Sequence, residues 1–185
     1  YEKVMGENPS NVNGKKLPVE KVNFYDAREF CRKLTVLEKK TGRVPQGWNY
    51  VLPTEAQWEY ACRAGTVTVY SWGNDINSSR ANYKWNGGPN DGNDLKKTRD
   101  VGQYAPNPWG LFDMHGNVWE WVSDWKANYP ENAQTDPKGP ESGPGKVKRG
   151  GSWLNYGTNL RSAKRNPYPP SNRFDSFGFR LCLKQ

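Results

Sequence analysis

The sequence predicts an α+β fold that is rich in loops and contains two main helices and several short strands. Two segments carry a helix N-cap that is followed by apolar residues at helical spacing. Nineteen glycines and fourteen prolines interrupt the chain and favour loops. Nine tryptophans and ten tyrosines supply bulky core residues to a chain whose hydrophobic fraction is only 34%. We therefore expect a single domain over residues 1–185, with its own hydrophobic core.

The first predicted helix begins after Asn23, which caps it together with Asp26, a shorter stand-in for the Glu of a capping box. Residues 18–22 precede the cap as a short strand or an extended lead-in, and Gly42 is expected to end the helix. The apolar residues of this segment recur at helical spacing, which predicts one buried face. That face consists of Ala27, Phe30, Cys31, Leu34 and Leu37.

The second predicted helix follows a short strand at residues 50–52. Thr54 and Gln57 form another capping box, and Gly65 is expected to end the helix. Two of its side chains are expected to face the core, namely Trp58 and Ala61.

Residues 108–125 form the most unusual stretch of the chain, because four tryptophans fall within 17 residues. The stretch is too apolar for a linker and contains too many glycines for a regular helix. An extended backbone over residues 118–122 places Trp119, Trp121 and Trp125 on one face of a strand. A buried indole needs a partner for its N–H group, so we expect a core that includes polar contacts.

Charge and cysteine content narrow the classes of function. The net charge of +8 is compatible with nucleic-acid binding, but the basic residues are scattered, which favours a solvated surface and no nucleic-acid partner. The three cysteines form no Cys-x-x-Cys pair, and Cys31 and Cys62 are expected to be buried free thiols on helix faces. This sequence contains no signal peptide and no apolar run of membrane-spanning length.

His115 is the only histidine of the chain. Nucleophilic catalysis needs a second group that pairs with the imidazole, and the sequence shows no histidine, cysteine or serine set to do so. We therefore interpret His115 as a turn residue beside Gly116.

Four motifs resemble, in the same order, those of the formylglycine-generating-enzyme (sulfatase-modifying factor) superfamily, a variant of the C-type lectin fold. They are Leu-Pro-Thr-Glu-Ala-Gln-Trp-Glu-Tyr-Ala (52–61), Trp-Gly-Leu-Phe-Asp-Met-His-Gly-Asn-Val-Trp-Glu-Trp (109–121), Arg-Gly-Gly-Ser-Trp (149–153) and Gly-Phe-Arg-Leu (178–181). The resemblance implies two helices packed on small antiparallel sheets. Tyr1 corresponds to the middle of the superfamily's first strand-to-helix unit, so we expect a preceding segment that could carry an export signal.

The resemblance also implies calcium, held by oxygen ligands. The side chains of Asp113 and Glu120 and the carbonyls of Gly116 and Val118 match one site of the superfamily. Asn82 and the carbonyl of Tyr83 match the first ligands of another site, whose remaining ligands fall in a loop of altered length. The candidate residues of that loop are Asn90, Asp91, Asn93 and Asp94. Solvation of a polar loop is the alternative, and we expect a structural calcium at most, with no cofactor required for function.

The pattern after Trp153 argues against catalysis. Catalytic members of the superfamily carry two cysteines there, which bind copper, whereas residues 154–161 contain none and the next cysteine is Cys182. Related sulfoxide synthases bind iron through histidines, and His115 alone cannot build such a site. The resemblance therefore implies a protein that is not an enzyme.

Residues 154–160 and 166–177 contain no Trp, Met, Lys, Glu or Gln. When the adenines of an AAC codon are randomised, the resulting codons all end in C and cannot encode any of those five residues. Diversity-generating retroelements vary their C-type lectin targets in that way. Those targets end in a pattern similar to residues 178–181. The chain resembles such variable proteins, most closely treponemal variable surface lipoproteins, and residues 153–180 form the candidate variable region.

Aromatic residues among Asn, Ser, Asp and Pro are also typical of binding loops, since rigid rings give contact area and short polar groups adapt their hydrogen bonds. Scattered exposed aromatics without a role are the alternative. The predicted ligand contacts are Leu154, Asn155, Tyr156, Thr158, Asn159, Asn166, Tyr168, Asn172, Phe174, Asp175, Ser176 and Phe177. We expect structural roles for Arg161 and Arg180, and either a structural or a ligand-binding role for Arg165 and Arg173.

Together these inferences predict a monomeric, receptor- or adhesin-like module that binds a macromolecular ligand, a protein. The resemblance implies display on a bacterial outer envelope, with the membrane reached only through a lipid anchor outside this chain. Two alternatives stay open: an accessory protein with a fixed surface, and an unusual oxidase of the superfamily.

Overall fold

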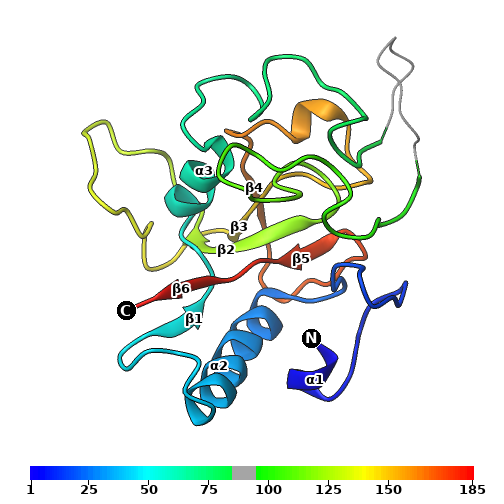
Figure 1. The fold of residues 1–185 in the computed structure, drawn as a ribbon. Helices are drawn as coiled ribbons and strands as arrows, with labels where there is room; N and C mark the ends of the chain where they lie inside the picture. The colour runs from blue at the N-terminus through cyan, green and yellow to red at the C-terminus, as the bar shows by residue number, and fades with distance from the viewer. Residues whose placement is uncertain (85–94) are drawn as a thin grey trace.

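The computed structural model describes residues 1–84 and 95–185, and its elements form the expected α+β arrangement (Figure 1). The helical elements are α1 (Glu2–Met5), α2 (Phe24–Lys40), α3 (Glu55–Arg63) and the 3-10 turn η1 (Gly157–Asn159). The strands are β1 (Asn49–Val51), β2 (Trp119–Trp125), β3 (Lys146–Arg149), β4 (Asn166–Tyr168), β5 (Phe177–Phe179) and β6 (Cys182–Lys184). The rest of the described chain consists of turns and loops.

Two small sheets organise the domain. β1 pairs with β6 in one antiparallel sheet, and the other sheet has the strand order β4-β3-β2-β5. Its β4–β3 and β3–β2 pairs are antiparallel as expected, whereas β2 and β5 run parallel. The chain between β2 and β5 is long enough for the crossover that parallel pairing requires.

Both capping boxes form, which explains why the sequence located the helix starts. The Asn23 side chain accepts a hydrogen bond from the Asp26 N–H at 2.9 Å, and Asp26 accepts one from the Asn23 N–H at 2.9 Å. Thr54 and Gln57 exchange the same pair of bonds at the start of α3. Residues 18–22 form no strand, and the chain bends at Lys21, whose φ is 57°, just before the cap.

The buried face of α2 differs from the prediction at its C-terminal end. Leu37 is 43% exposed and Leu34 is only half-buried, whereas Thr35 is buried. The Thr35 hydroxyl donates to the Cys31 carbonyl at 2.8 Å and accepts from the Tyr50 N–H at 2.9 Å. A threonine whose hydroxyl is satisfied in this way can face β1, whereas Leu37 points outward.

The tryptophan-rich strand β2 is covered on both faces. Trp119 and Trp121 lie in one core cluster with Phe24, while Val122 packs with Trp58 in another. The shared face predicted for the indoles is therefore confirmed for Trp119 and Trp121. Trp125 lies on that face as well, because it pairs with Lys146 while Trp121 pairs with Lys148, two residues along β3. The register shift between Trp121 and Trp125 therefore keeps the alternation of faces, and the Lys146 Nζ lies over both the Phe24 and the Trp125 rings.

The indole N–H groups find the polar partners that were expected. Trp121 donates to the Val22 carbonyl at 3.0 Å, and Trp119 donates to the Asn155 side chain at 2.7 Å. These bonds connect the centre of the sheet to the lead-in before α2 and to the loop after β3.

Cys31 and Cys62 are buried free thiols, as predicted. Burial raises the pKa of Cys31 to about 11 and that of Cys62 to about 12, so both are neutral thiols at pH 7. Within the described residues, every helix is too short or too polar to span a membrane.

Candidate functional site

The two predicted binding stretches meet at Trp153, whose indole N–H donates to the Asp175 carbonyl at 3.2 Å. Three large side chains of these stretches are exposed around this contact, at 50% for Leu154, 45% for Tyr156 and 41% for Phe174. Thr158 is exposed as well. The exposed side chains are the part of the predicted contact set that a ligand can reach.

The backbone beneath Leu154 and Tyr156 is held by buried groups. The Asn155 side-chain oxygen accepts from the Trp119 indole at 2.7 Å and from the Ser152 hydroxyl at 2.6 Å, and its carbonyl accepts from the Lys84 N–H at 2.9 Å. The Tyr70 hydroxyl donates to the Gly157 carbonyl at 3.0 Å. Asn155 therefore anchors the loop, and its bonds leave its neighbours to face outward.

The second stretch contains two residues that the prediction misplaced. Ser176 is 4% exposed and Phe177 is 5% exposed, so their prediction as ligand contacts is wrong. Phe177 belongs to β5 and lies opposite Trp119 in the parallel β2–β5 pair, which places its ring in the core. The sequence read this segment as loop because a three-residue strand among Ser and Gly leaves no periodic signal.

The other predicted contacts lie at intermediate depth. Phe174 packs edge-on against Tyr168, with ring centroids 5.6 Å apart, and thereby covers Phe177. Four further predicted contacts are half-buried, namely Asn159, Asn166, Asn172 and Asp175.

The four arginines of this region all have protein partners. Arg161 donates to the Thr158 carbonyl at 3.0 Å, and Arg180 pairs with Glu120, which confirms their structural roles. Arg173 forms a two-pronged ion pair with Asp26 at the start of α2, with both N–O distances at 2.8 Å. Arg165 pairs with Glu55 of α3. The structure thus assigns structural contacts to the two arginines that the sequence left open.

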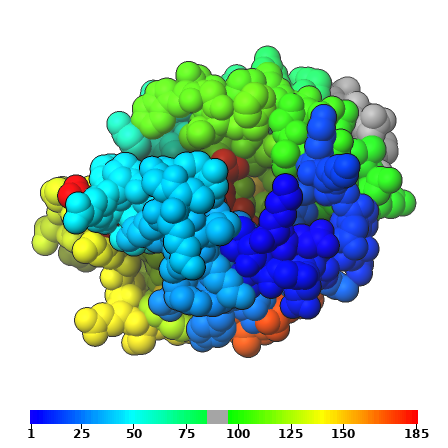
Figure 2. All heavy atoms as spheres, turned by 60° about the horizontal axis from the view of Figure 1, so that its bottom comes forward, coloured from blue at the N-terminus to red at the C-terminus, as the bar shows by residue number. Residues whose placement is uncertain are grey.

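The four residues predicted as one calcium site do line a common cavity of about 390 Å³, together with Arg180. Figure 2 shows a hollow on this side of the molecule, with atoms of the C-terminal segment in red at its floor. The Glu120 carboxylate accepts from the Trp58 indole at 2.6 Å and from Arg180 at 2.6 and 2.7 Å. Asp113 accepts from the Gly102 N–H at 2.7 Å, and burial raises its pKa.

These contacts do not favour a cation beside Glu120, because Arg180 already neutralises that carboxylate. Within residues 1–84 and 95–185, no group of three or more acidic, histidine or cysteine side chains is arranged to hold a metal ion. Calcium bound by Asp113, Glu120 and the carbonyls of Gly116 and Val118 stays a prediction.

Asn82, predicted as a first ligand of the other calcium site, is 2% exposed. Its side-chain N–H donates to the Lys97 carbonyl at 2.9 Å, while its side-chain oxygen has no hydrogen-bond partner among the described residues. A buried amide oxygen without a partner fits a hard cation. The further ligands predicted for this site, Asn90, Asp91, Asn93 and Asp94, lie outside the described residues.

His115 has the neighbours that the sequence did not reveal. Its Nε2 lies 3.5 Å from the Cys62 Sγ and 3.1 Å from the Ser71 Oγ, so the expectation that it lacks a Cys or Ser partner is wrong. The Ser71 N–H donates to Nε2 at 3.2 Å, and Nδ1 lies 2.6 Å from the Leu160 carbonyl. Since a carbonyl only accepts, the proton is assigned to Nδ1 and the imidazole is neutral.

The electrostatics of this cluster oppose nucleophilic chemistry. Burial lowers the pKa of His115 to about 4 and raises that of Cys62 to about 12. A reactive cysteine needs a thiolate beside a charged imidazole, and both groups here are neutral at pH 7. His115 and Cys62 are also 4% and 0% exposed. The cluster therefore connects α3 to the loops around Ser71 and Leu160.

His115 should make the domain less stable in mild acid. Its folded pKa of about 4 lies below the model-peptide value of about 6.5, so the unfolded chain binds an additional proton between these pH values. The stability that this group contributes is present above pH 6.5 and is lost as the pH falls towards 4, by about 3 kcal/mol. Urea unfolding at pH 7.0 and 4.5 measures the loss, and His115→Gln should reduce it. An equal loss in the variant would contradict the assignment.

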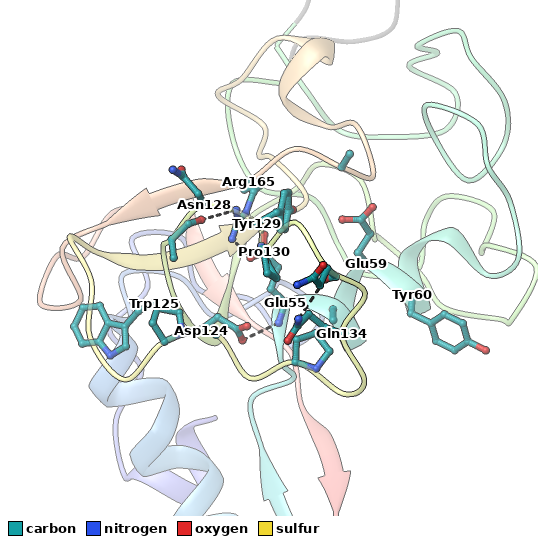
Figure 3. A pocket seen from close by; sticks show the side chains of 17 residues that line it. Glu55, Glu59, Tyr60, Asp124, Trp125, Asn128, Tyr129, Pro130, Gln134 and Arg165 are labelled. Carbon is teal, nitrogen blue, oxygen red and sulfur yellow. Dashed lines mark hydrogen bonds and ion pairs between the residues drawn. The ribbon is translucent and has the colours of Figure 1, made fainter.

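A further cavity, of about 520 Å³, lies between α3 and the loop that follows β2, and no sequence pattern indicated it (Figure 3). Arg165 donates to Glu55 at its floor, and its guanidinium lies 4.1 Å from the centre of the Tyr129 ring. The Glu55 N–H donates to Asp124 at 2.8 Å, and burial raises the pKa of Asp124. The acids of this cavity are thus already bound to groups of the protein.

Residues 2–185 match the family described as the sulfatase-modifying factor enzyme 1-like domain. The chain belongs to this family. It is 35% identical over 188 residues to the formylglycine-generating enzyme of Mus musculus, with 96% of this chain and 47% of that protein covered. The chain thus spans less than half the length of that enzyme.

Two solved structures place this member of the family in its fold. Treponema denticola variable protein 1 is 32% identical, with a TM-score of 0.82 over 98% of this chain and 79% of that one. PvdO from Pseudomonas aeruginosa is 29% identical, with a TM-score of 0.79 over 99% of this chain and 74% of that one. The fold is the C-type lectin fold in the form found in formylglycine-generating enzymes, as the sequence motifs predicted.

Proposed function

We propose that this family member is a non-catalytic binding module whose C-terminal loops contact a ligand. The observation that carries the proposal is the exposure of Leu154, Tyr156 and Phe174 on loops whose backbone is bound to buried groups. An anchored loop loses little conformational entropy on binding, and aromatic side chains give large contact area for few rotatable bonds. Similarity to Treponema denticola variable protein 1 over nearly the whole chain supports this class of function.

The same loops have the properties needed for diversification by a retroelement. Exposed positions such as Tyr156 and Thr158 accept new side chains without altering the core, while the buried residues between them preserve the loop. We further propose that the module is a monomer that acts at a bacterial cell surface, through a lipid anchor outside this chain, on a protein ligand. The resemblance to treponemal surface lipoproteins supports the proposed surface location, lipid anchor and protein ligand.

The loop positions should separate into tolerant and intolerant ones. Tyr156→Ser should lower the free energy of unfolding by about 1 kcal/mol or less, as surface changes usually do. Phe174→Ser should lower it by about 1–2 kcal/mol, because its exposed ring also packs on Tyr168 and Phe177. Phe177→Ser should lower it by about 3–5 kcal/mol, because the ring is in the core. Urea unfolding of the three variants gives the comparison. Comparable losses in all three would contradict a surface that can be diversified.

DNA next to the gene tests the diversification itself. We expect a near-copy of the segment encoding residues 153–180 beside a reverse transcriptase gene, with mismatches only where the copy has adenine. The mismatched codons should include those of Tyr156 and Thr158 and should spare Phe177. A locus without such a copy, with the same loop residues in sister strains, would favour the accessory protein with a fixed surface.

The oxidase alternative has its own test. The chain holds three cysteines, but Cys31 lies on α2, Cys62 on α3 and Cys182 on β6, and none lies in the loop after Trp153. We expect the purified domain, supplied with Cu(I) and a cysteine-containing peptide, to consume no more oxygen than the same copper and peptide consume without the protein. Oxygen consumption that depends on both the peptide and the protein would replace the binding proposal with catalysis.

A further inference from the structure

A cavity of about 640 Å³ lies between α2 and β1. Figure 1 shows α2 and β1 side by side at the end of the domain opposite η1. Of the residues that the structure describes, four basic ones and no acidic one line the cavity. The basic residues are Arg28, Arg32 and Lys39 of α2 and Lys146 of β3.

The basic side chains converge because of their positions in the two elements. Arg28, Arg32 and the apolar residues Phe24 and Val36 are spaced four apart along α2, which puts them on one face of the helix. That face borders the cavity, and Leu52 contributes to its opposite wall. The cavity thus combines a cationic edge with an apolar floor.

Lys146 is the buried cation of this cavity, at 8% exposure. Its Nζ donates to the Ser123 carbonyl at 2.6 Å and lies 4.6 Å from the Phe24 ring centre and 4.3 Å from that of Trp125. Among the described residues it has no carboxylate within ion-pair distance. Burial lowers the pKa of this lysine, although the charge of Asp124 acts on it from beyond ion-pair distance. A buried ammonium without a carboxylate in direct contact is costly, so an anion in the cavity would stabilise it.

The other basic groups leave the cavity positive as well. Arg28 lies over the Phe24 ring at 5.8 Å and has no ion-pair partner in the described chain. Lys39 donates to the Asn49 side chain at 3.0 Å, which is uncharged. Only Arg32 is paired, with the exposed Glu29. Arg28, Arg32 and Lys39 are exposed at the edge of the cavity, where their summed field attracts anions, while Lys146 is buried.

We propose that this cavity binds a small organic anion that carries a carboxylate, sulfonate or phosphate group beside an apolar body. The charged group would contact Lys146 and Arg28, whose N–H donors form charge-assisted hydrogen bonds with such oxygens. The apolar body would lie on Phe24 and Leu52. The cavity shares no lining residue with the stretch at 154–177, although the Phe24 N–H donates to the Pro170 carbonyl and Lys146 pairs with Tyr168 of β4. The inference rests on the charges of the cavity and does not require the proposed function.

A pair of fluorescent probes tests the anion requirement on the whole chain. 8-Anilinonaphthalene-1-sulfonate is an aromatic anion, and N-phenyl-1-naphthylamine is its neutral counterpart. We expect Lys146→Met and Arg28→Gln each to weaken binding of the anionic probe at least tenfold and to change binding of the neutral probe less than twofold. Lys146→Arg should restore most of the affinity. Lys40→Met, at the end of α2 and outside the cavity, is the matched control.

Location and ligand source need separate measurements. Addition of the anionic probe should shift the NMR amide signals of Thr35, Tyr50 and Ser123, and thermal unfolding of each variant verifies that it folds. Soluble octanoate should compete with the probe, whereas phosphatidylglycerol vesicles should not co-sediment the protein. The proposal would be overturned if the Lys146 and Arg28 variants lost affinity for both probes equally, or kept their affinity for the anionic probe. It would also be overturned if the shifted NMR signals were confined to residues 154–177, or if the protein bound vesicles and no soluble anion.

Discussion

Replacing Arg149 with methionine should lower the free energy of unfolding by about 3–5 kcal/mol. Arg149 is 0% exposed and forms ion pairs with Glu59 and, at 3.5 Å, with Glu55. It also donates to the Ser162 carbonyl at 2.8 Å and to the Lys164 carbonyl. Methionine fills a similar volume but leaves the two carboxylates and two carbonyls without this donor. Urea unfolding at pH 7 measures the loss.

Arg161 provides the matched control for Arg149. Its side chain is exposed and makes one hydrogen bond to the protein, to the Thr158 carbonyl at 3.0 Å. Arg161→Met should therefore cost less than about 1 kcal/mol. The stability loss of Arg149→Lys should fall between those of the two methionine variants. Lysine keeps the charge but lacks the planar guanidinium, which donates to several acceptors at once. An Arg149→Met protein as stable as Arg161→Met would contradict the role assigned to this ion network.

Replacing Lys148 with methionine should have the opposite effect and stabilise the domain by on the order of 2 kcal/mol at pH 7. Lys148 is 1% exposed, and its Nζ lies 3.0 Å from the Phe177 ring centre and 4.3 Å from that of Tyr168. No carboxylate of the described chain pairs with it. Burial lowers the pKa of Lys148 to about 6, and the ring faces offset only part of that cost.

The pH dependence identifies the cause of this gain. The unfolded lysine has a pKa of about 10.4, so between pH 6 and pH 10 the unfolded chain binds one more proton than the folded chain. The free energy of unfolding of the wild type should therefore rise with pH across this window, and the Lys148→Met protein should lack that contribution. Unfolding at pH 6.0, 7.5 and 9.0 compares the two. If the variant were less stable than the wild type at all three pH values, the aromatic rings around Lys148 would favour the charged amine, which contradicts the prediction.

Arg149 and Lys148 are neighbours on β3, and they show what decides the effect of a buried cation. The Arg149 side chain reaches the acids of α3 from one face of the sheet. The Lys148 side chain lies on the other face, against the rings of Tyr168 and Phe177. Both residues are polar and adjacent in a strand, so the sequence gives no indication that their energetic roles differ. The difference arises from the elements that cover each face of the sheet.

The candidate site divides in the same way. Local composition predicted that residues 154–160 and 166–177 form exposed loops, and Leu154, Tyr156, Thr158 and Phe174 fit that prediction. It could not show that Asn155 is an anchor, because its partner Trp119 lies 36 residues earlier in the chain. Phe177 was misread because only pairing with β2 makes it a core residue.

The sequence by itself determined the two helix starts, the shared face of Trp119 and Trp121, and the family. Caps and strand parity depend on residues within a few positions of one another, so they can be read locally. Only the tertiary structure decided the contact of His115 with Cys62, 53 residues away, the pairing of Arg165 with Glu55, 110 residues away, and the acid-free cavity at Lys146. Such contacts depend on how the helices and sheets pack, and a local pattern of residue types carries no record of that packing.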